Sequence, residues 1–115
     1  MLIERGAEVN SREKWDFTPL HFAAQEGYVE ISRVLIDHGA NVNVRNQDQW
    51  TPLHISSYRG RLEIVKLLLE RGADVHARND EDQTPYKVSL HRGYREVADL
   101  LWEHGKNREG SNLFD

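Results

Sequence analysis

A spacing of 33 residues recurs along the chain and limits its possible folds more than any other feature. The tetrapeptide TPLH occurs at residues 18–21 and again at 51–54, and the related TPYK occupies residues 84–87. Two series of glycines keep the same step: Gly27, Gly60 and Gly93, and Gly6, Gly39, Gly72 and Gly105. Self-similarity at this period predicts an array of stacked units.

Each unit contains the start and stop signals of two helices. Thr18, Thr51 and Thr84 are expected N-caps, because each precedes a proline that suits the first helical position. The first series of glycines can adopt the left-handed conformation that ends a helix. A second helix is expected next, as at residues 62–72, where apolar residues recur at helical spacing and Glu63 lies in the first turn. The expected stops of these second helices are Gly39, Gly72 and Gly105.

One such helix pair cannot bury its own apolar stripe, so neighbouring pairs must stack. The sequence resembles the ankyrin-repeat family over residues 1–111, most closely in TPLHFAAQEGYVEISRVLIDHGANVN and TPLHISSYRGRLEIVKLLLERGADVH. The resemblance implies an all-α fold, an ankyrin-repeat solenoid of stacked helix-turn-helix units with β-turn finger loops. It also implies that the chain binds proteins through its finger tips and first helices, and it brings no catalytic residues.

We expect a single ankyrin-repeat domain over residues 1–111. Its parts are a partial N-terminal repeat at 1–12, repeats at 13–45 and 46–78, a C-terminal capping repeat at 79–111, and a frayed tail at 112–115. Unit three has Tyr86-Lys87 in place of Leu-His and loses the repeat pattern after Gly105, which is typical of a terminal cap. Fraying is expected to begin near residue 108.

The family usually has glycine two residues before each capping threonine, whereas this chain has Asp16, Gln49 and Asp82. Aspartate tolerates a left-handed turn conformation fairly well, and glutamine tolerates it less well. The sequence therefore leaves the turn geometry of the second finger open.

Composition narrows the classes of function. The chain has no cysteine, which excludes disulfides, cysteine-ligated zinc and thiol nucleophiles. Lys and Arg total 15 against 19 Asp and Glu, so the sequence argues against a nucleic-acid partner, whose phosphates require surplus positive charge. There is no apolar run of membrane-spanning length and no leader, so we expect no membrane partner and a cytoplasmic or nuclear location.

His21 and His54 occupy equivalent positions and raise the question of a metal site. Stacked helices lie about 8–10 Å apart, whereas two histidine nitrogens that share one zinc ion must each lie about 2.0–2.1 Å from it. We expect instead that they bond to the backbone of the adjoining loop, as in the family, and that the protein holds no metal or cofactor. No hydrolase, zinc-protease or P-loop motif occurs, so we expect no enzymatic activity.

Aromatic residues gather at positions that an ankyrin stack places on its concave side. Trp50 stands just before its N-cap, at the position of Phe17, and Tyr58 lies at the other end of the same first helix. Together with Trp15, these residues predict an aromatic strip across the first two units. The alternative is that some rings fold over the loop stems and cover neighbouring backbone.

Charged residues are expected to flank this strip, acidic in the fingers and basic at the ends of the first helices. Opposite charges along one groove would set the direction of a bound chain, and Trp, Tyr and Arg dominate binding hot spots. The candidate partner-binding residues are Trp15, Phe17, Asp48, Trp50, Tyr58, Arg59, Asp80, Glu81, Gln83, His91 and Arg92.

The sequence therefore favours a non-enzymatic protein–protein interaction module that binds a protein segment on its concave surface. An alternative is a structural fragment of a longer array, or a unit that self-associates through its incomplete N-terminal repeat, where Leu2 and Ile3 would be partly uncovered. The resemblance also makes Asn10 and Asn43 candidates for hydroxylation, the alternative being asparagines that stabilise their loops.

Overall fold

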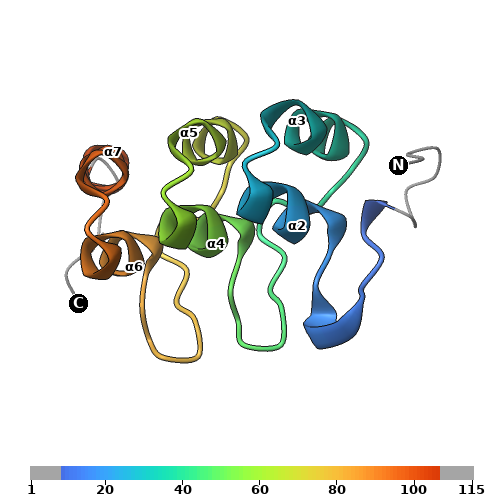
Figure 1. Ribbon diagram of the computed structural model, residues 1–115, viewed down its shortest axis with the longest axis horizontal. Helices are drawn as coiled ribbons and strands as arrows, with labels where there is room; N and C mark the ends of the chain where they lie inside the picture. Colours follow the sequence, from blue (N-terminus) through green and yellow to red (C-terminus); the bar gives the residue numbers. More distant parts are fainter. Residues whose placement is uncertain (1–8, 107–115) are drawn as a thin grey trace.

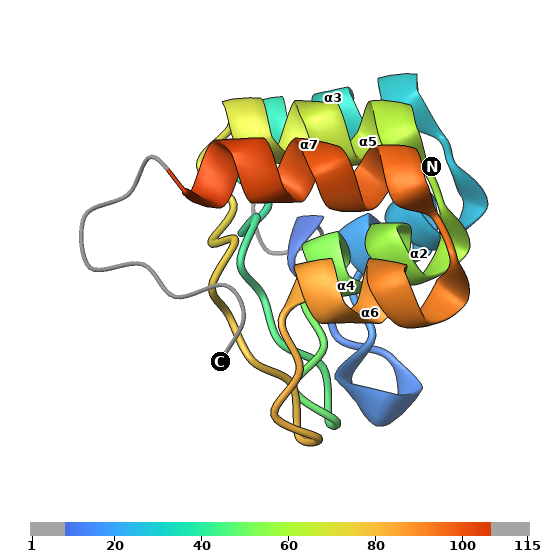
Figure 2. The same ribbon diagram turned by 90° about the vertical axis from the view of Figure 1, so that its left-hand side faces the viewer.

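The computed structural model describes residues 9–106, which form three helix pairs in a row (Figure 1). The first helices of the pairs make one layer and the second helices make another, and three loops project from the first layer, away from the second (Figure 2). The first helices are α2 (Pro19–Glu26), α4 (Pro52–Arg59) and α6 (Pro85–Arg92), and the second helices are α3 (Val29–Asp37), α5 (Leu62–Glu70) and α7 (Arg95–Gly105). The predicted all-α solenoid is confirmed. Predictions for Leu2, Ile3 and the C-terminal tail fall outside the described residues.

The predicted caps of the first helices are confirmed. The hydroxyl of each capping threonine accepts the backbone N–H of the residue three positions on, at 3.3 Å in α2, 3.2 Å in α4 and 3.3 Å in α6. Each helix ends at a glycine in the left-handed conformation: Gly27, Gly60 and Gly93. The local signals of the sequence thus define the first helices at both ends.

The predicted stop of the last helix was wrong. Gly39 and Gly72 follow α3 and α5 with φ of 101° and 91°, but Gly105 remains inside α7. The following residue explains the difference, because units one and two have buried alanines there, whereas unit three has the exposed Lys106. The N–H of Lys106 donates to the carbonyl of Trp102, four residues back, so the helix continues.

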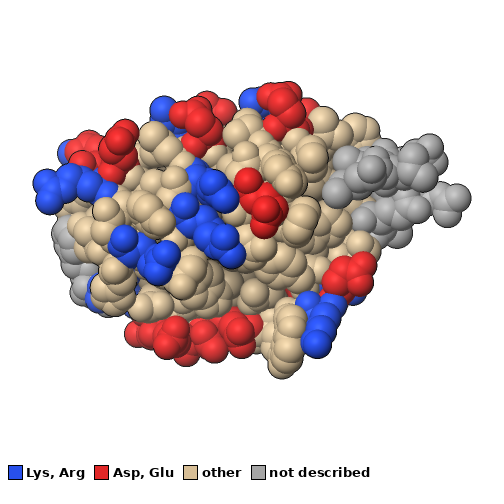
Figure 3. Space-filling view, in the orientation of Figure 1, with Lys and Arg blue, Asp and Glu red and all other residues tan. Residues whose placement is uncertain are grey.

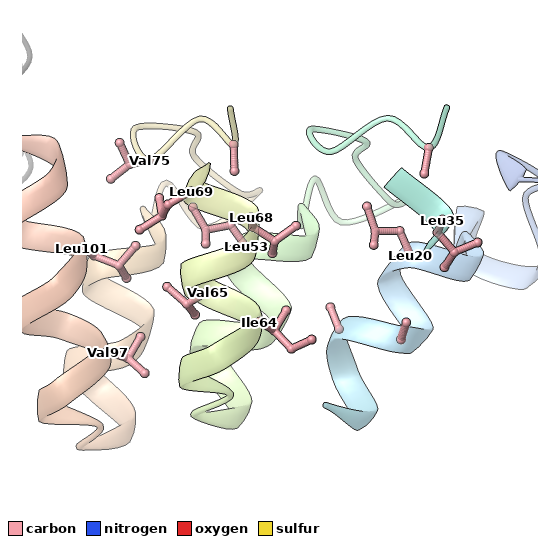
Figure 4. Close-up of a cluster of buried hydrophobic side chains, with 14 of the residues drawn as sticks. Leu20, Leu35, Leu53, Ile64, Val65, Leu68, Leu69, Val75, Val97 and Leu101 are labelled. Atoms are coloured by element: carbon pink, nitrogen blue, oxygen red, sulfur yellow. The ribbon is translucent and has the colours of Figure 1, made fainter. Parts of the chain in front are cut away.

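The core lies between the two layers and runs along the whole row (Figure 4). First helices contact first helices of adjacent units, and second helices contact second helices. Truncation of a fully buried leucine typically costs about 2–5 kcal/mol. The side chains buried to within 1% of full coverage include Leu20, Leu35, Leu53, Ile64, Leu68 and Leu101.

The tips of the loops are five-residue turns at 13–17, 46–50 and 79–83, which we name fingers one, two and three. In each finger the first backbone N–H donates to the carbonyl of the fifth residue, at 2.8, 3.0 and 3.0 Å. Gln49 has φ of 66°, close to the 61° of Asp82, so finger two has the same turn as finger three despite its glutamine.

Asparagine side chains explain why Gln49 adopts this conformation. The Oδ1 atom of Asn46 accepts the N–H groups of Asp48 and Trp50, both at 2.9 Å, and Asn79 does the same in finger three. Finger one has Glu13 at this position and no such side-chain bond. There Trp15 also has positive φ, 69°, within a short 3-10 helix η1 (Lys14–Asp16).

Hydrogen bonds connect each finger to the next. The N–H of Gln47 donates to the carbonyl of Trp15 at 2.9 Å, and the N–H of Asp80 donates to the carbonyl of Asp48 at 3.0 Å. The Nη1 atom of Arg12 donates to the carbonyl of the equivalent arginine of the next unit, Arg45, at 3.0 Å. The fingers therefore form one connected row.

Asparagine side chains also join the loops of successive units, as the structural alternative predicted. The Oδ1 atom of Asn10 accepts the N–H of Asn41 at 3.0 Å, and the Oδ1 atom of Asn43 accepts the N–H of Asp74 at 2.7 Å. The amide groups donate back to the carbonyls of Gly39 and Gly72. The loop-stabilising role is confirmed, and hydroxylation stays a prediction.

Candidate functional site

A groove of about 440 Å³ opens between the fingers and the C-terminal ends of the first helices. It spans units one and two and reaches finger three. Six of the residues that line it are among those predicted from the sequence: Phe17, Asp48, Trp50, Tyr58, Arg59 and Glu81. The fold thus brings together side chains from three units.

Trp50 and Tyr58 form the aromatic centre of the groove. Their ring centroids lie 5.5 Å apart in an edge-to-face arrangement. The guanidinium of Arg92 lies 4.3 Å from the centroid of the Tyr58 ring, and its Nε donates to the Tyr58 carbonyl at 3.3 Å. Tyr58 is therefore held between a tryptophan of its own unit and an arginine of the next, yet 38% of its surface stays exposed.

Buried histidines fix the stems of the fingers. The N–H of Thr18 donates to Nδ1 of His21 at 3.1 Å, so the ring proton is on Nε2, which donates to the carbonyl of Trp50 at 2.9 Å. His54 makes the same bonds one unit on, reaching the carbonyl of Gln83 at 2.8 Å. The predicted structural role of these histidines is confirmed.

Burial keeps both rings neutral. Desolvation lowers the pKa of His21 below its ordinary value of 6.5. It lowers the pKa of His54 to about 4, and the bond to the Gln83 carbonyl only partly opposes this shift. Within residues 9–106, no group of three His, Asp or Glu side chains is arranged to hold a metal ion.

The rings at the ends of fingers one and two cover these histidines. Phe17 stacks on His21, with centroids 5.0 Å apart and planes 19° apart, and the Trp50 ring lies 5.7 Å from the ring of His54. The alternative interpretation, in which aromatic rings fold over the loop stems, is therefore partly correct. Trp50 is half-buried and has both a covering role and an accessible face in the groove.

The remaining predicted residues lie around the groove or apart from it. Trp15 is 61% exposed at the tip of finger one, beside Lys14, and does not line the groove. Gln83 lies 3.3 Å from the ring of His91, measured between Nε2 and Nδ1, at the edge of unit three. Asp80 is exposed in finger three, where its backbone bonds to finger two. The predicted aromatic strip is thus confined to Phe17, Trp50 and Tyr58.

Charges of opposite sign lie on the two sides of the groove. Lys and Arg gather over the ends of α4 and α6, and Asp and Glu line the tips of fingers two and three (Figure 3). Arg59 and Arg92 are exposed at these helix ends, and Asp48 and Glu81 are exposed in the fingers. A bound segment would therefore have acidic side chains on one side and basic side chains on the other.

Three residues of the groove were not predicted: Gln25, Asn46 and Ile55. Gln25 occupies the position of Tyr58 one unit earlier, so the 33-residue register could have indicated it. Asn46 recurs as Asn79, and an asparagine that starts a turn is a known signal for side-chain bonds to the backbone. Ile55 has no such signal.

Family models match the repeat architecture of the chain. A family model described as ankyrin repeats in three copies matches residues 1–79, and a model described as ankyrin repeats in many copies matches residues 59–101. The chain belongs to the ankyrin-repeat family. Ankyrin repeats generally serve as protein–protein interaction modules and are typically non-enzymatic.

No curated protein matched the chain in a sequence search. None of the helices among the described residues has both the length and the apolar character needed to cross a bilayer.

Proposed function

We propose that the chain is a non-enzymatic binding module that takes an extended or helical segment of another protein into the groove beside Trp50 and Tyr58. The observation that carries this proposal is the edge-to-face pair of these two rings, 5.5 Å apart, between finger carboxylates on one side and Arg59 on the other. Tryptophan, tyrosine and arginine are the residue types most enriched in binding hot spots.

Preorganisation supports the same function. Tyr58 is fixed by Trp50 and Arg92, and the carbonyl of Trp50 is held by His21. Side chains that are already ordered lose little conformational entropy when a partner binds. The groove therefore loses less contact energy to the ordering of these side chains when a partner binds.

Charge would set the orientation of the partner. Asp48 and Glu81 would attract basic side chains of the segment, and Arg59 would attract acidic ones. The residues proposed to act at the rim are Trp15, Asp80, Gln83, His91 and Arg92. A segment with basic and acidic residues on opposite sides fits this arrangement.

Selection from a peptide display library on the folded protein, followed by calorimetry, tests the proposal. We expect Trp50→Ala to weaken the selected peptides by about 30-fold or more, equivalent to the hot-spot threshold of about 2 kcal/mol. Leu90→Ala is the control, because Leu90 is 49% exposed and does not line the groove.

A second variant separates binding from folding. Trp50→Ala also uncovers His54, whereas Arg59→Glu leaves the aromatic contacts in place. We expect Arg59→Glu to weaken binding by about tenfold and to change its salt dependence. The denaturant midpoint should fall only slightly, because a carboxylate at the C-terminal end of α4 costs about 0.3–1 kcal/mol. Peptides whose affinity neither variant lowers, or the absence of any selected peptide, would contradict the proposal.

A further inference from the structure

Two carboxylates line the finger side of the groove. Asp48 and Glu81 are the third residues of fingers two and three, and both belong to the groove lining. The N–H of Asp80, next to Glu81, donates to the carbonyl of Asp48 at 3.0 Å, so the backbone holds the two acidic residues at adjacent points of the finger row. Their placement is therefore a property of the fold.

Neither carboxylate is neutralised by the described part of the chain. Both residues are exposed, and the ion pairs formed within residues 9–106 include neither of them. Asp82, next to Glu81, pairs instead with Arg78 at 3.5 Å. Arg59 lines the same groove and, among these residues, pairs with neither carboxylate. The lining thus has two negative charges against one positive charge, and a cationic guest would balance it.

Trp50 provides an aromatic surface beside these carboxylates. Its ring covers that of His54, with centroids 5.7 Å apart, and also lines the groove. Tryptophan attracts a cation to its ring face more strongly than tyrosine or phenylalanine does. The ring of His54 does not repel such a cation, because burial lowers its pKa to about 4 and keeps it neutral.

Tyr58 shows that a guanidinium can stack on this aromatic pair. The guanidinium of Arg92 lies 4.3 Å from the centroid of the Tyr58 ring. Arg92 does not line the groove, and none of the cation–ring contacts within residues 9–106 involves Trp50. The chain therefore supplies a cation to one ring of the pair and leaves the other ring open to a partner.

We propose that the groove holds one arginine side chain of the partner segment, stacked on Trp50 and hydrogen-bonded to Asp48 and Glu81. This inference rests on the proposed function and names the residue that anchors the segment. A guanidinium has five N–H donors in a planar fork, so it can stack on a ring while its edge bonds to carboxylates, whereas an ammonium group is a compact point charge. Arg59, on the helix side of the groove, would meet an acidic residue of the same segment.

Sequencing of the peptides selected on the folded protein tests the inference. We expect them to share an arginine at one position. Replacement of that arginine by citrulline, which has a similar shape and no charge, should weaken binding by about tenfold or more, and lysine should restore only part of the affinity. Peptides that depend on Trp50 but bind equally well without arginine would overturn the inference and leave the proposed function in place.

Variants of the protein test the two carboxylates. Asp48→Asn combined with Glu81→Gln should weaken the arginine peptides by about tenfold and reduce the salt dependence of binding. Glu96→Gln combined with Asp99→Asn is the matched control, because it removes the same two kinds of charge from exposed positions of α7, in the other layer of helices. Equal losses of affinity from the two pairs of substitutions would overturn the inference.

A small probe tests the site even if no peptide is selected. Nα-acetyl-L-arginine methylamide, titrated at millimolar concentrations, should shift the indole N–H signal of Trp50 in NMR spectra, and its citrulline analogue should not. Trp15 and Trp102 give internal reference signals, since neither lines the groove. An unshifted Trp50 signal, or equal shifts from both probes, would overturn the inference. The library and the probe can therefore fail separately.

Discussion

The ring of Tyr94 lies so close over Gly60 that a Cβ atom at residue 60 would come within 2.8 Å of the ring carbon Cδ1. Tyr94 belongs to unit three and Gly60 to unit two, so this contact helps to set the distance between the units. Gly93 occupies the equivalent position one unit later, with φ of 80° and no atom within 4 Å of such a Cβ. Both glycines thus have a positive φ, but only Gly60 has a side chain packed against it.

Gly60→Ala is therefore expected to destabilise the protein more than Gly93→Ala. Both variants place an L-residue in the left-handed region, which costs about 1–2 kcal/mol. Only Gly60→Ala also displaces an aromatic ring, and overpacking adds about 1–3 kcal/mol. Urea unfolding of both variants measures the difference, and equal losses would show that Tyr94 moves aside freely.

Ser57→Ala is expected to leave stability unchanged or to raise it by about 1 kcal/mol. The Oγ atom of Ser57 is buried without a hydrogen-bond partner among the described residues, and a buried unpaired hydroxyl is unfavourable. Its neighbour Ser56 is the control, because its Oγ donates to the carbonyl of Leu53 at 3.2 Å. Both substitutions raise helix propensity by the same amount, but only Ser56→Ala removes a hydrogen bond. Ser56→Ala should therefore be the less stable of the two variants in chemical denaturation. The reverse order would contradict the prediction.

Stability is expected to fall as the pH is lowered from 7 to 5. His54 has a pKa of about 4 in the folded protein and an ordinary value of 6.5, so the unfolded chain binds the proton first as the pH drops. The loss from His54 over this range is about 2 kcal/mol, and His21 acts in the same direction. Denaturant unfolding at both pH values should show a smaller loss for His54→Asn, and an identical loss would contradict the assignment.

Asn46→Ala is expected to loosen finger two. The change removes the acceptor of two backbone N–H groups, those of Asp48 and Trp50, and should cost about 1–2 kcal/mol. Hydrogen exchange at the Trp50 amide should become faster. Glu13→Ala in finger one is the matched control, since Glu13 makes no capping bond there and its replacement should change stability by less than about 0.5 kcal/mol. Unchanged exchange at Trp50 would argue that the backbone alone holds the turn.

Trp50→Ala should cost less stability than Leu68→Ala. Leu68 is fully buried in α5, and its truncation is expected to cost about 2–5 kcal/mol. Trp50 is half-buried, so part of its ring surface is in water before the change. Guanidinium unfolding of the two variants checks the order, and an equal loss would mean that Trp50 acts mainly as a core residue.

The helix ends could be predicted because their signals are local. Thr51 caps α4 through its own hydroxyl, and Gly60 ends the helix through its own left-handed conformation. Gly105 shows the limit of this reasoning, because the exposed Lys106 follows it, whereas a buried alanine follows Gly39 and Gly72. Gln49 shows the opposite case. Glutamine disfavours a positive φ, but the two hydrogen bonds accepted by the Asn46 side chain hold the turn in that conformation.

The groove could be predicted only in part, because it depends on contacts between units. The register placed Trp50 and Tyr58 on one side of the stack, and the structure brings their rings together. No pattern in the sequence shows that Arg92 stacks on Tyr58, or that Phe17 covers His21 while Trp15 points elsewhere. The contact of Arg92 with Tyr58 joins units two and three, and the contact of Phe17 with His21 depends on how the side chains of unit one are oriented.

The arginines of the loops show how an array of this kind can change in length. Arg12 donates to the carbonyl of Arg45, and Arg45 donates in turn to the carbonyl of Arg78 at 2.8 Å. Arg45 thus carries both halves of the junction, a side-chain donor for the next unit and a carbonyl acceptor for the previous one. Duplication of the 33-residue unit that ends at Arg45 repeats the same junction, whereas an insertion of another length between two such arginines changes their spacing. Gene rearrangements that respect the period are therefore the ones that the structure tolerates.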